Sequence, residues 1–126
     1  MHPFRAAVES RDMDAVAALL GDDVVFRSPV AFKPYRGRAA VATILHAVLR
    51  VFDDFRYVRE IGEPGAADHA LVFQARVGDQ QIEGCDFLHV DDQGSIDEFV
   101  VMVRPLSATL ALAKAMQAEL AAAEGS

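Results

Sequence analysis

The sequence has a single cysteine, no cluster of lysine or arginine, and no apolar run that approaches the length of a membrane-spanning helix. One cysteine, Cys85, cannot form an internal disulfide, and it excludes a cysteine-rich metal site. With a net charge of −7, the chain lacks the positive patch that binding to nucleic acid or to an anionic membrane surface requires. We find no charged-then-apolar leader and no apolar run near ~18 residues, so we expect no membrane span and a cytoplasmic location.

Apolar residues make up 52% of the chain and charged residues 25%, a balance typical of globular proteins. The 126 residues contain no internal repeat and no linker, and we expect a single domain over residues 1–126. A chain of this length buries roughly two thirds of its extended surface, which is enough for a core and a modest cavity.

The clearest pattern is a β-hairpin over residues 80–105. Strands are predicted at 81–90 and 95–104, and the turn between them places Gly94 where a positive φ is needed. Every second residue of the first strand belongs to one apolar face that contains a carboxylate. The residues of this face are Ile82, Gly84, Asp86, Leu88 and Val90.

Asp86 is the unusual member of this face. A carboxylate among apolar side chains is costly unless it is neutral, paired or engaged in chemistry. We therefore predict a pocket in which Asp86 acts as an acid or hydrogen-bond donor, because burial raises the pKa of a carboxylate. The alternative is a structural aspartate paired with Arg104 or with backbone groups.

Helical spacing of apolar residues predicts four helices, at residues 4–10, 12–20, 38–53 and 106–122. Asp12 is expected to cap the second helix and Gly21 to end it. The last helix is alanine-rich, and residues 124–126 beyond it are expected to fray. Its expected packing points are Leu106, Leu110 and Met116.

Alternation predicts three further strands, at residues 24–28, 55–60 and 69–77. Residues 30–37 have turn chemistry and no period, so we expect an irregular rim there. This order of elements indicates an α+β fold: a cone-shaped, curved antiparallel sheet with N-terminal helices and a long helix packed on its concave side. Such a cone can hold a ligand.

Two sets of residues are expected to line the pocket beside Asp86. The apolar set is Phe26, Leu71, Phe73, Leu88, Phe99, Val101 and Val103. Ser28 at a strand end and Tyr35 in the rim are the polar candidates for ligand contact. Each has a structural alternative: core packing for the apolar set, a local backbone hydrogen bond for Ser28, and surface exposure for Tyr35.

The opposite face of the hairpin is also largely apolar. Its residues are Cys85, Phe87, His89, Val100 and Met102. A sheet with apolar residues on both faces needs cover on both, and the helices can cover only one. We therefore predict a homodimer through this outer face, with Cys85 as a packing residue.

The four histidines give no sign of a metal site. They are His2, His46, His69 and His89. Neither an H-x-x-x-H motif nor a carboxylate-rich spacing accompanies them. We expect neither a bound metal nor a cofactor.

Three segments carry a family resemblance: GDDVVFRSPVAFKPYRGR at 21–38, IEGCDFLHVDDQGSI at 82–96, and the strand that ends in MVRP at 102–105. Together they resemble the superfamily of nuclear transport factor 2-like cone-shaped proteins, which includes ketosteroid isomerases and SnoaL-like polyketide cyclases. Their order and spacing cover almost the whole chain. The resemblance implies the same cone, and relatives with this fold commonly form dimers through the sheet.

The resemblance places Asp86 where ketosteroid isomerases have the protonated aspartate of their oxyanion hole. Their general-base aspartate, after the first strand, corresponds to Ser28. Their oxyanion-hole tyrosine corresponds to Phe4, and its two supporting tyrosines correspond to Leu20 and Leu45. One of the three catalytic groups is thus present, and the resemblance implies that the supporting hydrogen-bond network has become apolar.

Moving a proton between carbons needs a base within hydrogen-bond reach, and serine is not basic near neutral pH. Ordinary ketosteroid isomerase activity is therefore not expected. The epoxide hydrolases of the superfamily use an arginine two residues before a strand aspartate, where this chain has Gly84, so that activity is not expected either.

We expect a protein that binds a small apolar carbonyl compound, steroid-, terpene- or polyketide-like, with Asp86 as acid or hydrogen-bond donor. If it is an enzyme, the activity is of an isomerase or cyclase type. The alternative is a non-catalytic ligand-binding or protein-interaction scaffold of the same fold.

Overall fold

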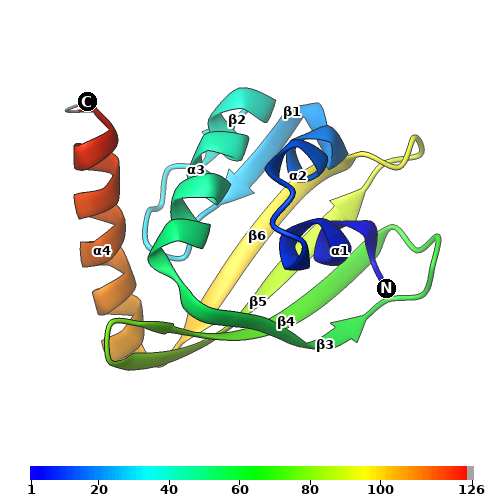
Figure 1. Cartoon of the computed structure of the whole chain (residues 1–126). Helices are drawn as coiled ribbons and strands as arrows, with labels where there is room; N and C mark the ends of the chain where they lie inside the picture. Colours follow the sequence, from blue (N-terminus) through cyan, green and yellow to red (C-terminus); the bar gives the residue numbers. More distant parts are fainter. Residues whose placement is uncertain (125–126) are drawn as a thin grey trace.

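The computed structural model describes residues 1–124. Figure 1 shows helices on one side of a curved sheet and the C-terminal helix standing at one end of it. The helices are α1 (Pro3–Glu9), α2 (Met13–Leu19), α3 (Arg38–Val51) and α4 (Leu106–Glu124). The strands are β1 (Leu20–Arg27), β2 (Tyr35–Arg36), β3 (Asp53–Ile61), β4 (Asp68–Val77), β5 (Gln80–Val90) and β6 (Ile96–Arg104). The predicted α+β cone is confirmed. The fraying predicted for residues 124–126 is wrong at Glu124, because Glu124 is the last residue of α4; Gly125 and Ser126 lie outside the described residues.

Residues 1–124 contain a six-stranded sheet with the strand order β2-β1-β6-β5-β4-β3. Four of its five pairings are antiparallel, as predicted, but β1 and β6 run parallel. Parallel neighbours need a crossover connection, which α3 and the strands β3 to β5 provide. The prediction of a wholly antiparallel sheet is therefore wrong at this pairing. The sheet curves without closing, and β2 and β3 form its edges.

The chain passes from α2 directly into β1. Asp12 caps α2 as predicted, because its side chain accepts a hydrogen bond of 3.0 Å from the Ala15 N–H. Gly21 does not end the helix, since Leu20 already has extended backbone angles and begins β1. Gly21 instead lies inside the strand, where a Cβ atom would sit 3.3 Å from the carbonyl oxygen of Ile96 on β6.

The third helix lies over the concave side of the sheet, as predicted (Figure 1). Its buried residues are Val41, Ile44, Leu45 and Ala47. The rim before it is not wholly irregular, because Tyr35 pairs with Phe26 and Arg36 with Val25 to form β2. The sequence analysis missed this strand since two residues are too few to show an alternating pattern.

The hairpin of β5 and β6 follows its predicted boundaries to within one residue. Gly94 has the predicted positive φ, 83°. The Asp91 side chain holds the turn by accepting hydrogen bonds from the backbone N–H groups of Gln93 and Ser95. In this register Asp86 lies opposite a residue of β4 on one side and of β6 on the other, so it sits within the paired part of the sheet.

The C-terminal helix packs through a different face from the predicted one. Leu106 and Leu110 are 73% and 62% exposed, so two of the three expected packing points are wrong. Met116 is buried as expected, and the residues buried with it are Ala108 and Leu112. Removing Leu112 and Met116 from water stabilises the docked helix by roughly 1.5–3 kcal/mol each. An ion pair between Arg50 of α3 and Glu119 adds a second tether.

Within residues 1–124, no helix is long and apolar enough to span a membrane.

Two leucines of α4 provide a test of this packing. Leu112→Ala is expected to lower the free energy of unfolding by about 2–5 kcal/mol, because it leaves a cavity in the core. Leu110→Ala should change it by no more than about 0.5 kcal/mol, as an exposed substitution does. Urea unfolding of the two variants measures both effects, and equal losses would contradict the observed face.

Candidate functional site

A cavity lies between the concave face of the sheet and the helices. The volume that the centre of a water molecule can reach in it is about 50 Å³. All four helices contribute to its lining, together with strands β1, β3, β4, β5 and β6. In the described part of the chain, this lining is apolar except for Ser28, Tyr57 and Asp86.

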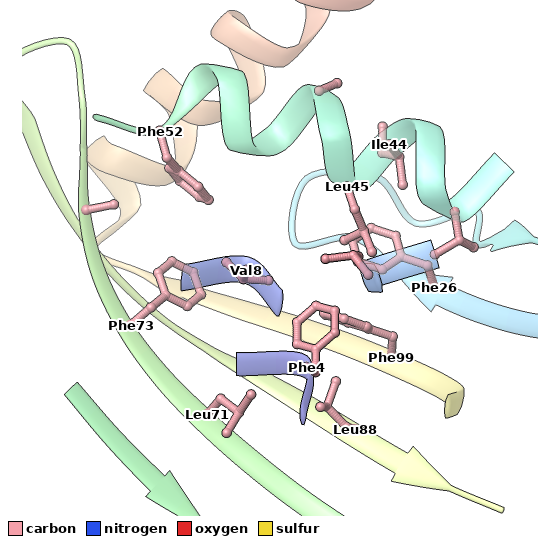
Figure 2. Close-up of a cluster of buried hydrophobic side chains, with 14 of the residues drawn as sticks. Phe4, Val8, Phe26, Ile44, Leu45, Phe52, Leu71, Phe73, Leu88 and Phe99 are labelled. Atoms are coloured by element: carbon pink, nitrogen blue, oxygen red, sulfur yellow. The ribbon is translucent and has the colours of Figure 1, made fainter. Parts of the chain in front are cut away.

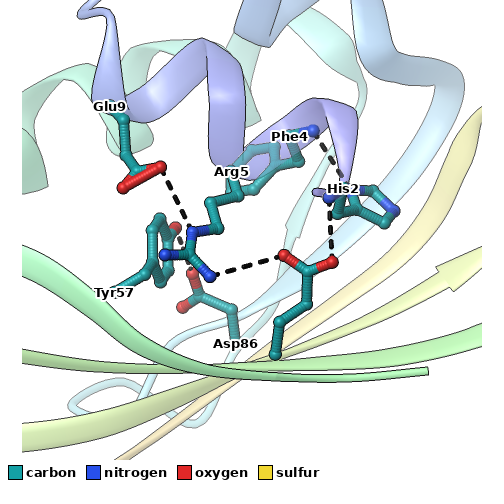
Figure 3. Close-up of polar contacts among 7 residues, drawn as sticks. His2, Phe4, Arg5, Glu9, Tyr57 and Asp86 are labelled. Atoms are coloured by element: carbon teal, nitrogen blue, oxygen red, sulfur yellow. Dashed lines mark hydrogen bonds and ion pairs between the residues drawn. The ribbon is translucent and has the colours of Figure 1, made fainter. Parts of the chain in front are cut away.

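Asp86 and Tyr57 form a hydrogen-bonded pair at the cavity. The Tyr57 hydroxyl donates to Oδ2 of Asp86 over 2.8 Å, and each residue is only 6% exposed. Tyr57 comes from β3 and Asp86 from β5, so the phenol reaches across β4. Figure 3 shows the pair beneath α1.

Burial controls the ionisation of both groups. It raises the pKa of Asp86 from 3.8 to about 7, while the hydrogen bond from Tyr57 acts in the opposite direction. Burial also raises the pKa of Tyr57 well above 10.0, and the neighbouring Asp86 adds to the rise. Near neutral pH, Tyr57 therefore remains a donor and much of Asp86 carries a proton. A protonated Asp86 has an O–H group of its own to donate.

Charged groups of α1 lie over this pair but do not line the cavity. Arg5 contacts Glu9 at 3.2 Å and Glu60 of β3 at 3.6 Å. Figure 3 shows the Arg5 side chain extending down from α1 beside Tyr57. Glu9 raises the pKa of Tyr57 and Arg5 lowers it, both by less than Asp86 does. These charged side chains therefore shift the pKa of Tyr57 from outside the cavity. Asp86 is the ionisable carboxyl that lines the cavity itself.

Two groups of phenyl rings narrow the cavity. In the first, the ring centroid of Phe99 lies 5.1 Å from that of Phe4 and 5.3 Å from that of Phe26. In the second, the centroid of Phe73 lies 5.0 Å from that of Phe55 and 5.5 Å from that of Phe52. Figure 2 shows Phe4, Phe26 and Phe99 gathered below α3, and Phe73 facing Phe52. The rings meet, and a small void remains.

Gly84 explains why the Phe73 ring can lie close to β5. The two residues are opposite each other in the β4–β5 pairing. A Cβ atom at position 84 would lie 2.3 Å from Cζ of Phe73 and 2.9 Å from a methyl carbon of Val103. A side chain at this position would therefore displace the ring, and glycine keeps that space open.

The cavity brings together some of the predicted site residues and leaves others out. Those that line it are Phe26, Ser28, Phe73, Asp86, Phe99 and Val101. Four predicted residues lie outside the lining: Tyr35, Leu71, Leu88 and Val103. Leu71 and Leu88 are completely buried in the core, and Tyr35 packs against the ring of Phe26.

Sequence reasoning missed Tyr57. The positions that the resemblance matches to the isomerases' tyrosines (Phe4, Leu20 and Leu45) are apolar and buried. The phenol that reaches Asp86 comes instead from Tyr57 of β3. Tyr57 alternates with Phe55 along β3, so the two side chains share a face, and this alternation is a usable signal. The sequence does not reveal that the phenol of Tyr57 reaches across β4 to Asp86.

The positions matched to the isomerase groups have mixed surroundings. Phe4 and Leu45 line the cavity, whereas Leu20 is buried outside its lining. Ser28 lines the cavity, and its Oγ accepts a hydrogen bond of 3.1 Å from the Val30 N–H. Ser28 thus satisfies a local backbone group, and that bond leaves its own O–H hydrogen unused.

Arg104 does not pair with Asp86. It lies opposite Glu83 in the β5–β6 register and is within 3.5 Å of that carboxylate. The partner of Asp86 is therefore a neutral phenol and not a cation, which is consistent with the raised pKa of its carboxyl. Among residues 1–124, no group of three or more His, Cys, Asp or Glu side chains is arranged to hold a metal ion.

Comparison with known proteins defines the class as a nuclear transport factor 2-like, ketosteroid isomerase-like cone. A steroid delta-isomerase from Pseudomonas aeruginosa is 41% identical, with a TM-score of 0.92 over 98% of this chain and 90% of that one. An uncharacterised protein with a cystatin-like fold from Silicibacter pomeroyi is 38% identical, with a TM-score of 0.89 over 96% and 87%.

The model of the SnoaL-like domain matches residues 2–99, and the chain belongs to this family. A SnoaL-like protein of unknown function from Burkholderia thailandensis shares the fold at 14% identity, with a TM-score of 0.66 over 82% of this chain and 90% of that one. A search of curated proteins gave no match.

The raised pKa of Asp86 predicts a pH-dependent stability. The pKa of Asp86 is about 7 in the folded state and 3.8 ordinarily. Folding therefore takes up a proton when the pH lies between these two values. Wild type then loses stability as the pH rises through this window. Asp86→Asn does not titrate, and it keeps an oxygen that can accept from Tyr57.

As the pH rises from about 4 to about 8, the free energy of unfolding of Asp86→Asn should therefore increase by about 4 kcal/mol relative to that of wild type. This figure follows from about 1.4 kcal/mol per pKa unit. Urea unfolding of both proteins across this range measures the difference. A stability difference that is independent of pH would show that Asp86 ionises normally.

Proposed function

We propose that this chain binds a small apolar molecule with a carbonyl oxygen, and that protonated Asp86 donates a hydrogen bond to that oxygen. The observation that carries the proposal is the buried Asp86–Tyr57 pair at an otherwise apolar cavity. A carbonyl group buried without a partner costs roughly 1–3 kcal/mol. A single donor therefore fixes the orientation of an apolar ligand.

A neutral acid suits this task. Ionised Asp86 would bring an uncompensated charge into an apolar cavity, whereas the protonated form brings only an O–H group. Tyr57 already donates to Oδ2, so the remaining donor capacity of the carboxyl is directed to a ligand. The proposed apolar contacts are Phe26, Phe73, Phe99 and Val101, and Ser28 is the second polar contact.

Whether a reaction follows binding depends on a base. The steroid delta-isomerase similarity at 41% identity supports a carbonyl ligand. At the position of the isomerases' base, however, Ser28 already accepts a hydrogen bond from the backbone. If the chain catalyses a proton transfer of isomerase or cyclase type, the group suited to it is Asp86, whose pKa of about 7 allows it to take up and release a proton.

The competing function is a non-catalytic ligand-binding or protein-interaction scaffold. A turnover assay on any ligand found separates the two. An enzyme loses its rate in Asp86→Asn, because an amide cannot exchange the proton. A ligand-binding scaffold shows no turnover in either protein and retains ligand binding in the variant.

Ligand binding should depend on pH in a specific direction. A thermal-shift screen of steroid-, terpene- and polyketide-like carbonyl compounds identifies a ligand for wild type. Its affinity should fall as the pH rises above about 7, because Asp86 then loses the proton it donates. In Asp86→Asn the affinity should be independent of pH, since the amide N–H₂ group remains a donor.

Two further variants serve as controls for this prediction. Asp86→Leu removes the donor and should abolish most of the binding at every pH. Tyr57→Phe removes the hydrogen bond that lowers the pKa of Asp86, so the pH midpoint of binding should move upward. A wild-type affinity that is constant from about pH 5 to pH 9, or a midpoint that moves downward in Tyr57→Phe, would contradict the proposal.

We further propose that two copies of the chain associate through the outer face of the sheet. Phe87 and Met102 are 42% and 60% exposed there. Cys85 lies opposite Met102, and Val100 lies opposite Phe87. These residues form an apolar patch, and His89, which pairs with Asp97 at 2.6 Å, lies beside it. Apolar side chains exposed together on one face favour self-association.

Charge placed in this patch should weaken the dimer. Phe87→Glu and Met102→Glu are each expected to raise the dissociation constant at least about tenfold, because an unpaired buried charge costs roughly 2–5 kcal/mol or more. Leu110→Glu, on the exposed face of α4, is the matched control and should leave association unchanged. Sedimentation velocity over a concentration series measures all three, and a monomeric wild type would rule the association out.

A further inference from the structure

The volume of the cavity restricts the choice of ligand more than the polarity of the cavity lining does. Pockets for drug-sized ligands usually have volumes of roughly 300–1,000 Å³, and an apolar cavity of about 150 Å³ binds benzene. The present cavity, at about 50 Å³, is smaller than both. A single ring therefore needs small side-chain adjustments, whereas fused rings need a lining side chain to be removed or a helix or the sheet to move.

The lining contains side chains that can make the small adjustments. Met116 lines the cavity, and methionine has three rotatable bonds that let it adapt to an irregular space. Val48 and Leu49 of α3 also line the cavity and are only partly buried. Rotation of such side chains admits one ring and leaves the backbone in place.

The larger walls are held firmly. On the sheet side, the ring of Phe73 rests against Gly84, and the contacts between the phenyl rings hold its neighbours in position. At one end of the sheet, α4 is docked through Ala108, Leu112 and Met116, and the Arg50–Glu119 ion pair joins it to α3 (Figure 1). A ligand that displaces α4 exposes this buried surface to water, and its affinity falls accordingly.

We propose that the ligand of this site is a monocyclic ketone, with its ring among the phenyl groups and its carbonyl oxygen at Asp86, and that Leu112 sets the upper limit on its size. The inference rests on the proposed function and adds the class of ligand. It excludes four-ring steroids as ligands of the wild-type cavity. Leu112 is the specificity-determining residue, because it lines the cavity from α4, the helix that stands at one end of the sheet (Figure 1).

Two saturated ketones test the limit: cyclohexanone, with one ring, and androstanedione, with four. Neither is an enone, so neither can alkylate Cys85. Protein-observed NMR titrations give the dissociation constants for wild type, Leu112→Ala and Leu110→Ala. A larger apolar ligand that fits normally binds more tightly than a small one, so weaker steroid binding indicates steric exclusion.

Wild type should bind cyclohexanone at least about tenfold more tightly than androstanedione. Leu112→Ala should improve androstanedione binding at least about tenfold, and Leu110→Ala, on the exposed side of the same helix, should not change it. If Leu112→Ala does not fold, Leu112→Val makes a smaller opening and should shift the affinity in the same direction. Asp86→Leu should lose cyclohexanone binding.

The possible failures are distinguishable. If wild type binds androstanedione as tightly as cyclohexanone, in a manner that Asp86→Leu abolishes, the size limit is overturned and the proposed function stands. If Leu112→Ala and Leu110→Ala respond alike to androstanedione, Leu112 does not set the limit. If wild type binds neither ketone, both the proposed function and the size limit fail.

Discussion

The hydrogen bond from Tyr57 to Asp86 joins β3 to β5 at a place where both side chains are buried. A carboxyl group that is buried and has no cation as partner keeps its proton to a higher pH, and Asp86 is such a group in an otherwise apolar lining. The phenol reaches across β4, so the bond links two strands that are not neighbours in the sheet. Burial and protonation of Asp86 are linked, because burial is the largest cause of its raised pKa.

The space around this pair depends on residues that have no polar role. Gly84 leaves room for the ring of Phe73, which in turn packs against Phe52 and Phe55. With these rings in place, the cavity measures about 50 Å³. Its volume depends on a few side chains, even where the backbone of the fold is the same. Structural similarity to a steroid delta-isomerase therefore does not show that the two cavities have the same size.

The sequence was sufficient for the features that depend on local pattern. Alternation on β5 placed Asp86 on an apolar face, and turn chemistry located the hairpin, since both signals lie within a few residues of one another. It was insufficient for Tyr57, because its partner Asp86 lies two strands away in the sheet. It also misjudged Leu106 and Leu110, because an alanine-rich helix has little contrast between its faces and Ala108 can be buried as readily as leucine. The parallel pairing of β1 with β6 joins segments so distant in the chain that no local pattern indicates it.

That parallel pairing has a consequence for how the protein forms. Leu20 lies opposite Ile96 and Phe26 opposite Phe99, so the first long strand has no partner on its β6 side until the last strand has been made. Contacts between residues so far apart in sequence slow folding, because a long loop must close first. During synthesis, β3, β4 and β5 can pair with one another before β6, the parallel partner of β1, has been made. The rings of Phe99 and Phe26 lie on these two strands, so the cavity is complete only when β1 and β6 have paired.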